Sequence, residues 1–244
     1  MGTNQEICAI AVMAKAPRPG QVKTRLVPPL APEEAAALNA AFLRDITETI
    51  KAAARHRAIA GYIAFAPSGQ EALFDGMLAP GTNLVLADGS GPMPDTVQGF
   101  GRSLFHAAHA LFAQGHGSVC LLNSDSPTLP AAFLVEAAEL LAAPGDRVVL
   151  GPAEDGGYYL IGMKEAHAAL FTGISWSTAA VVTETRARAR TLGLEVAELP
   201  LWYDVDDVGA LRRLARDLTE VPPSTRACLE RLRLFNPLVS CGST

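Results

Sequence analysis

Short apolar runs alternate along the chain with longer segments in which apolar residues recur every three or four positions. The short runs are typical of buried strands, and the longer spacing is typical of amphipathic helices. We expect strands at residues 7–14, 59–66, 84–87, 118–123, 147–150, 158–163 and 195–199. We expect helices at residues 32–54, 96–113, 129–142, 207–218 and 224–234, and another between Ser177 and Gly193.

Several of these helices have recognisable ends. Pro32 suits the first turn of the first helix, because proline lacks an N–H that this turn would leave unpaired. Thr128, Ser177 and Asp207 each precede a helical segment, and their side chains are expected to accept a hydrogen bond from its first turn. Gly193 is expected to end the helix that Ser177 begins.

Strands that alternate with helices indicate an α/β fold with a mostly parallel sheet. We expect one domain over residues 1–244, since no repeat or long linker interrupts the pattern. In such sheets, ligands bind outside the carboxyl ends of the strands. The chemistry is therefore expected in the loops that follow the strands, which are Lys15–Arg25, Asp88–Met93, Ser124–Pro127, Pro152–Gly157 and Asp204–Asp207.

The first of these loops is basic. Lys15, Arg18, Lys23 and Arg25 lie within it, and Gly20 interrupts regular structure there. Cations and exposed backbone N–H groups together suit a di- or triphosphate, which needs several charge-assisted donors. The loop lacks the spacing of a Walker A motif. The alternative is a solvated basic loop without a ligand.

The later loops are acidic. Asp125 follows the most apolar strand, and Ser124 beside it is a candidate phosphate contact. Mg²⁺ or Mn²⁺ takes one or two protein carboxylates and completes its shell with phosphate oxygens and water, so Asp125 is the first candidate metal ligand. Asp206 is the second, with Asp204 on the same side of the extended segment. Asp155 precedes two glycines, which let a substrate approach the backbone closely. Turns and helix caps are the alternative reading of these acids.

Composition narrows the class of protein. The chain is 49% hydrophobic and 18% charged, which indicates a folded protein, and its net charge of −5 argues against a nucleic-acid groove. The apolar stretch 7–14 is too short to span a bilayer and lacks a basic flank, so we expect a cytoplasmic protein that binds no membrane. The four cysteines show no C-x-x-C spacing and are expected to be free. No nucleophilic triad and no dinucleotide fingerprint is recognisable.

Four segments together resemble the bacterial DUF2064 family, also called radical-SAM/selenodomain-associated transferases. They run in the family's order and are Met13–Leu26, Ser124–Pro127, Gly151–Gly162 and Tyr203–Asp206. The resemblance implies a GT-A-like (Rossmann-like) three-layer α/β/α fold of the nucleotide-diphospho-sugar transferase superfamily. It also implies a nucleotide-activated donor, with the basic loop near the donor phosphates and Asp125 at the metal.

The chain departs from the family pattern at two places. Asn123 stands where the family usually has glycine. The family's Gly-Asp-Leu-Gly-Glu-Arg-Met-like segment is here Gly99-Phe-Gly-Arg-Ser-Leu104, so its acid is absent and its arginine is displaced. Arg102 is a candidate replacement for that arginine.

The leading hypothesis is a metal-dependent glycosyltransferase that moves a sugar from a nucleoside-diphosphate sugar to a small-molecule acceptor, with Mg²⁺ or Mn²⁺. Asp125, Asp155 and Lys23 are the candidate catalytic residues. Asp155 would orient or deprotonate an acceptor hydroxyl, and the cations would stabilise the leaving diphosphate. A nucleotidyltransferase that releases pyrophosphate and a non-catalytic nucleotide-binding module remain as alternatives. The identity of the base, sugar and acceptor, and the oligomeric state, stay open.

Overall fold

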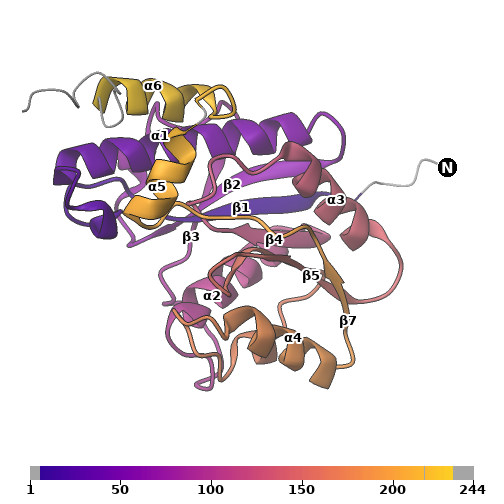
Figure 1. The fold of residues 1–244 in the computed structure, drawn as a ribbon. Coiled ribbons are helices and arrows are strands. Elements are labelled where there is room, and N and C mark those ends of the chain that lie inside the picture. Colours follow the sequence, from indigo (N-terminus) through magenta and orange to yellow (C-terminus); the bar gives the residue numbers. More distant parts are fainter. Residues whose placement is uncertain (1–5, 217, 233–244) are drawn as a thin grey trace, which may run out of the picture.

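A seven-stranded sheet runs through the computed structural model, which describes residues 6–216 and 218–232 (Figure 1). Its spatial order is β3-β2-β1-β4-β6-β5-β7. All neighbouring strands are parallel except β6, which is antiparallel to β4 and β5. The strands are β1 Cys8–Lys15, β2 Ile59–Ala66, β3 Asn83–Leu86, β4 Ser118–Leu122, β5 Arg147–Pro152, β6 Tyr158–Met163 and β7 Glu195–Glu198.

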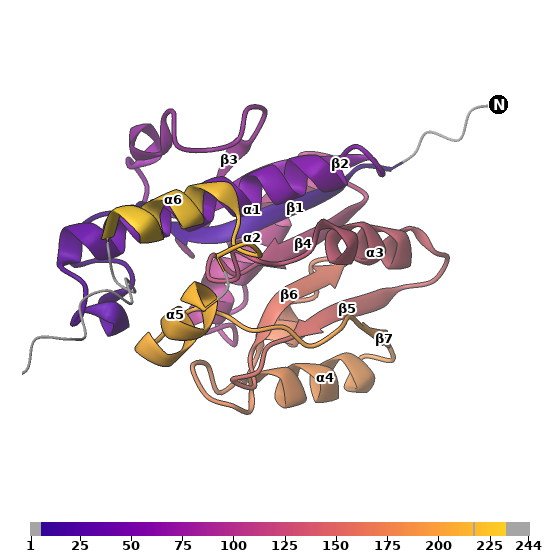
Figure 2. The same ribbon diagram turned by 45° about the horizontal axis from the view of Figure 1, so that its top comes forward.

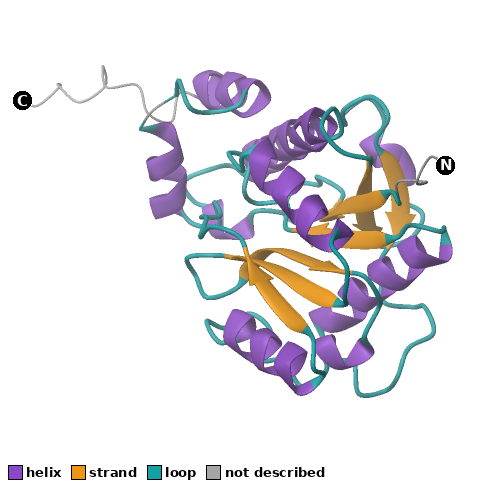
Figure 3. Ribbon diagram, turned by 90° about the vertical axis from the view of Figure 1, so that its right-hand side faces the viewer, coloured by secondary structure: helices purple, strands orange, loops and turns teal. Residues whose placement is uncertain are grey.

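Helices cover both faces of this sheet (Figure 3). The α-helices are α1 Pro32–Ala53, α2 Phe100–Ala113, α3 Ala131–Ala142, α4 Val181–Thr191, α5 Val208–Ala215 and α6 Pro223–Leu232. Short 3₁₀ helices are η1 Thr24–Leu26, η2 Glu71–Phe74 and η3 Ala168–Phe171. Helices α1 and α3 pack on one face, and α2 and α4 pack on the other.

Strand β1 shows how the sequence produces these layers. Alternate side chains of a strand point to opposite faces. Ile10 and Val12 therefore join the core beneath α1 and α3, whereas Ala9 and Ala11 join the core beneath α2 and α4. Because both faces are covered, β1 reads as a continuous apolar run. The mostly parallel α/β/α architecture expected from the sequence is confirmed.

A third apolar cluster lies outside the sheet, where α5 and α6 pack against α1 (Figure 2). Asp45 of α1 is buried, and its carboxylate accepts hydrogen bonds from the backbone N–H groups of Ser224 (3.0 Å) and Thr225 (2.7 Å). These N–H groups belong to the first turn of α6, which has no earlier carbonyl to bind. The carboxylate of Asp45 thus fixes the start of α6.

Two of the expected helix caps are wrong. Thr128 does not cap α3, which begins at Ala131; its hydroxyl instead accepts a hydrogen bond from Trp202 Nε1 (3.3 Å). Ser177 does not cap α4, since its backbone is left-handed (φ 64°) and the helix begins at Val181. Asp207 does cap α5, because its side chain accepts a hydrogen bond from the Ala210 N–H (2.8 Å).

The other boundaries need small corrections. Helix α2 begins at Phe100 rather than at residue 96, and α5 ends at Ala215 rather than at 218. The last two residues of the expected helix 224–234 lie outside the described residues, as does Cys241.

Cys8, Cys120 and Cys228 are free. No helix in the described ranges is long and apolar enough to cross a membrane. The expectation of one domain over residues 1–244 stays a prediction.

Candidate functional site

Two adjoining cavities open at the carboxyl ends of the parallel strands, where the sequence predicted the chemistry. The first has a volume of about 370 Å³ and the second about 240 Å³. Both are lined by Met13, Phe100, Ser124, Asp125 and Asp206. The two expected metal ligands therefore lie at the junction between the cavities.

The first cavity is cationic and partly apolar. Lys15, Lys23 and Arg25 of the basic loop line it, and their expected contact with phosphate stays a prediction. Its remaining lining is made of Ala14, Gln21, Val22, Thr24, Asn39, Ala64, Ala66, Ala87 and Ser103. Arg18 and Gly20 are exposed and line neither cavity, so their expected contacts with phosphate stay predictions.

The second cavity is acidic. Asp155 and Asp204 line it together with the shared Asp125 and Asp206, and its lining contains no lysine or arginine. Asp155 lies in an exposed turn, where its Oδ1 accepts a hydrogen bond from the Gly157 N–H (2.8 Å). Asp155 thus lies in the expected turn and also lines a cavity, and its contact with a substrate stays a prediction.

Lys23 joins the two carboxylates at the junction. Its Nζ lies 2.6 Å from Asp125 Oδ1 and 3.1 Å from Asp206 Oδ1, and it donates a hydrogen bond to the Val205 carbonyl oxygen (2.7 Å). The lysine side chain is only 4% exposed, and its Nζ lies over the Phe42 ring, 5.2 Å from the centroid. Lys23 therefore binds the carboxylates directly, which the sequence did not predict.

The backbone brings these distant residues together. The Val205 N–H donates a hydrogen bond to the Asp125 carbonyl oxygen (2.8 Å), so the segment before α5 runs beside the end of β4. Lys23 reaches both from a left-handed conformation (φ 50°, ψ 35°), which is uncommon for a residue with a Cβ. The Ser124 hydroxyl donates to Asp125 Oδ1 (2.9 Å).

The charges at the junction shift the pKa values of the acids in opposite directions. Burial alone would raise the pKa of Asp125, but the charge and hydrogen bond of Lys23 outweigh it and lower that pKa. Burial and the neighbouring charge of Asp125 raise the pKa of Asp206. Burial, with the charges of Asp155 and Asp206, raises the pKa of Asp204 to about 6. The charge of Lys23 thus favours the ionised form of Asp125, whereas burial and neighbouring carboxylates disfavour that of Asp204 and Asp206.

The donor set at the junction fits a hard divalent cation. Asp125 and Asp206 share one ammonium group and are 26% and 38% exposed, so an ion could reach their oxygens from the cavities. Mg²⁺ is commonly bound by one or two carboxylates together with substrate phosphates. Asp125 and Asp206 would supply the two carboxylates, and a substrate in the cationic cavity would supply the phosphates.

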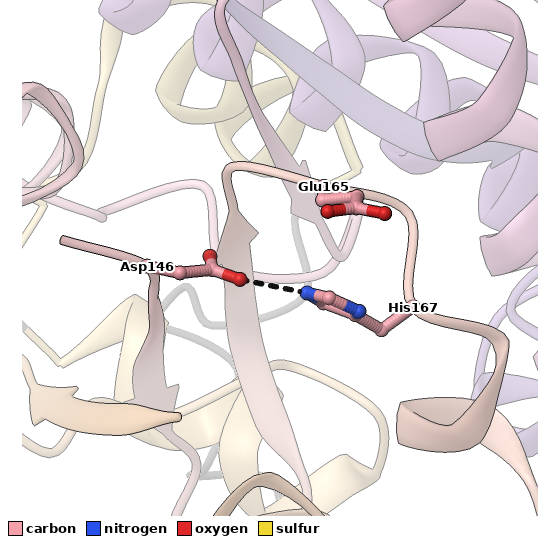
Figure 4. A group of neighbouring side chains, drawn as sticks. All are labelled: Asp146, Glu165 and His167. Carbon is pink, nitrogen blue, oxygen red and sulfur yellow. Dashed lines mark hydrogen bonds and ion pairs between the residues drawn. The ribbon is translucent and has the colours of Figure 1, made fainter. Parts of the chain in front are cut away.

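A separate group of possible metal ligands lies at the opposite edge of the sheet. Asp146 precedes β5, and Glu165 and His167 follow β6; their ligand atoms lie within 4.8 Å of one another (Figure 4). His167 Nε2 lies 2.9 Å from Asp146 Oδ2. Because these residues flank the amino end of β5, they are separate from the two cavities.

Asn39 and Phe100 are among the lining residues that the sequence analysis did not single out. Asn39 lies on an otherwise apolar face of α1, and that break in the apolar spacing was a usable signal. Phe100 lines both cavities and is 49% exposed; an aromatic residue at the start of a helix gives no such signal.

Arg102, the candidate replacement for the family's arginine, binds a neighbouring loop through its side chain. Its guanidinium donates hydrogen bonds to the carbonyl oxygens of Gly89 (2.9 Å) and Val97 (3.5 Å), and it lines neither cavity. His106 Nδ1 accepts a hydrogen bond from the Gly89 N–H (3.2 Å). Together they tie the loop 88–93 to α2, and that loop contributes no residue to the two linings.

The fold is one that nucleotide-using transferases share. A structure from Desulfovibrio desulfuricans G20, described as a candidate nucleotide-diphospho-sugar transferase, aligns with a TM-score of 0.77 and 29% identity over 93% of this chain and 95% of that chain. A CMP:2-keto-3-deoxy-manno-octonic acid synthetase complexed with CTP aligns with a TM-score of 0.53 and 11% identity, over 92% and 99% of the two chains. Glucosyl-3-phosphoglycerate synthase from Mycobacterium tuberculosis, in complex with Mn²⁺, UDP and glucosyl-3-phosphoglycerate, aligns with a TM-score of 0.51 and 13% identity, over 95% and 82%.

The assignment of this chain to a family rests on a match to a family sequence model, and not on these structural similarities. The model of DUF2064, described as an uncharacterized protein conserved in bacteria, matches residues 49–178, which is more than half of the chain. The chain therefore belongs to the DUF2064 family, as its motifs indicated. A comparison with curated proteins finds no match.

Proposed function

We propose that this protein is a metal-dependent glycosyltransferase that uses a nucleoside-diphosphate sugar and a small hydroxylated acceptor. The observation that supports this is the division of charge between the two adjoining cavities. Three basic side chains line the first cavity, and four carboxylates line the second, with Asp125 and Asp206 common to both.

The nucleoside diphosphate would occupy the first cavity. Lys15 and Arg25 line it and can donate charge-assisted hydrogen bonds to phosphate oxygens. Asp125 and Asp206 would hold Mg²⁺ or Mn²⁺ at the junction. When bound, the ion would neutralise charge that develops on the leaving diphosphate. Lys23, which already contacts both carboxylates, would keep them in place.

The acidic cavity favours a hydroxylated acceptor over a phosphorylated one. Carboxylates accept hydrogen bonds from sugar hydroxyls, whereas they repel a phosphate monoester. In the transfer, the bond between the anomeric carbon and the phosphate oxygen breaks, and a bond to the acceptor oxygen forms. Asp155 would take the proton that the acceptor hydroxyl releases.

The products of the reaction test this proposal. The protein would be incubated with Mn²⁺, a panel of sugar nucleotides and a panel of polyols. Release of nucleoside diphosphate supports glycosyl transfer. Release of pyrophosphate from a nucleoside triphosphate and a sugar phosphate would instead indicate a nucleotidyltransferase. Nucleotide binding that Asp125→Asn leaves unchanged, without turnover, would indicate a binding module. Absence of binding across the whole panel would overturn the proposal.

A further inference from the structure

Asn39 of α1 is a buried amide whose acceptor has no partner. The residue is 4% exposed and lines the first cavity. Its Oδ1 atom is fully buried and accepts no hydrogen bond from any described residue. A buried acceptor without a donor is costly, and such atoms in native proteins call for an explanation.

The position of Asn39 makes the amide harder to explain by packing. Ala35, Phe42 and Leu43, which lie one helical turn away on either side, are fully buried and apolar. A leucine at position 39 would fit that pattern and leave no acceptor without a partner. Because Asn39 lines the cavity, a turn of its amide would bring Oδ1 to a ligand there, and that ligand can supply the missing donor.

The chemistry of the missing partner excludes the phosphates. An ionised phosphate oxygen only accepts hydrogen bonds, so it cannot satisfy Oδ1. The N–H groups of a nucleobase and the hydroxyls of its ribose are donors. Small apolar residues also line the cavity, and a planar ring can pack against such a lining: Ala14, Ala64, Ala66 and Ala87.

We propose that Asn39 is a specificity-determining residue that accepts a hydrogen bond from the nucleoside half of the donor. This inference rests on the proposed function, because it places the nucleoside diphosphate in the first cavity. It assigns Lys15 and Arg25 to the diphosphate, and Asn39 with the apolar lining to the nucleoside.

Binding measured by calorimetry on the full chain tests this division. In the Asn39→Leu variant, the Kd of the preferred nucleoside diphosphate should rise about tenfold, since one hydrogen bond is lost. The Kd of inorganic pyrophosphate, which has no nucleoside, should change less than twofold. The Tm of the variant should rise, because the unpartnered acceptor is removed. Asn39→Ala, which removes the amide without adding bulk, decides the matter should Asn39→Leu not fold.

Thr185→Val is the matched control. Thr185 is fully buried in α4, lies outside both cavity linings, and its hydroxyl also has no partner among the described residues. This variant should raise the Tm and leave both dissociation constants unchanged.

The ligand panel separates the two sources of the donor. If wild type and Asn39→Leu bind a 2′-deoxynucleotide with the same Kd, the donor is the 2′-hydroxyl of the ribose. If the difference in Kd between the two proteins changes with the base of the nucleotide, the donor is an N–H group of the base. Equal weakening of pyrophosphate and nucleotide, or an unchanged nucleotide Kd, would overturn the role of Asn39. A wild-type protein that binds pyrophosphate but no nucleotide would overturn the proposed function itself.

Discussion

The ammonium of Lys23 lies 2.6 Å from Asp125 Oδ1, although 101 residues of chain separate the two positions. The lysine side chain is almost fully buried, and it also contacts Asp206. Removal of a buried charge leaves its partners uncompensated. Lys23 therefore stabilises the acidic junction before any ligand binds.

Lys23→Met should lower the free energy of unfolding by about 2–3 kcal/mol, because two crowded carboxylates lose their shared cation. Urea unfolding measures this difference. Lys51→Met is the control at an exposed ion pair, since the Lys51 side chain is 42% exposed and its Nζ lies 3.6 Å from Glu48 Oε2. That exposed pair should contribute less than about 0.5 kcal/mol. Equal effects of the two substitutions would contradict the role of Lys23.

Asp125→Asn should abolish the gain in nucleoside-diphosphate affinity that Mn²⁺ provides. An amide oxygen carries no charge to hold the ion beside the phosphates. Calorimetric titrations with and without Mn²⁺ measure that gain. Asp146→Asn changes the separate group at the other edge of the sheet and should leave the gain intact. If Asp146→Asn abolished the gain instead, the metal that assists the nucleotide would lie elsewhere.

Asp204→Asn should make the protein more stable at neutral pH. The folded protein raises the pKa of Asp204 from 3.8 to about 6, so the protonated form is favoured in the folded state. The stability linked to this shift is present below pH 3.8 and is lost as the pH rises through about 6. Asparagine does not ionise, so the variant keeps this stability at high pH. Its free energy of unfolding at pH 7.5 should be about 1 kcal/mol higher than that of the wild type, after allowance for the partial exposure of Asp204. Thermal unfolding in EDTA from pH 4 to 8 shows whether the two curves converge in acid.

Gly156→Ala should destabilise the turn that presents Asp155. Gly156 has φ +89°, and a Cβ there would lie 2.3 Å from the Ala179 carbonyl oxygen. We expect a loss of about 2–3 kcal/mol, from the left-handed conformation and the steric clash together.

Gly145→Ala is the control for the conformation alone. Gly145 has φ +90°, but the nearest atom to its Cβ would be Arg147 Nη2, at 4.0 Å. This variant should lose only about 1–2 kcal/mol. Chemical denaturation of both variants compares them, and a similar loss in each would show that the contact with Ala179 is unimportant.

The sequence predicted the parts of the fold that depend on local spacing. The strands 59–66 and 158–163 have the expected bounds, because apolar runs flanked by turn residues define them without reference to the rest of the chain. The predicted helix caps at Thr128 and Ser177 were wrong, because such positions also depend on contacts with distant parts of the chain. Thr128 binds Trp202, which is 74 positions away, and no local pattern reveals that contact.

The same limit applies to the candidate site. The expected strand ends predicted that the cavities would lie at the carboxyl ends of the parallel strands, and that the acids at positions 125, 155 and 206 would lie there. That Lys23 would bind two of these acids depends on how the segment before α5 crosses the end of β4, through the hydrogen bond from Val205 to Asp125. A tertiary crossing of this kind leaves no periodic signal in the chain.

The sheet order also determines when the site can form during synthesis. Strand β1 obtains its neighbour β2 once residue 66 has left the ribosome, but its other neighbour β4 ends at residue 122. Asp125 follows directly, whereas Asp206 comes 81 positions later. A nascent chain therefore displays the basic loop long before both carboxylates exist to bind Lys23. The junction can therefore assemble only after residue 206 has been synthesised.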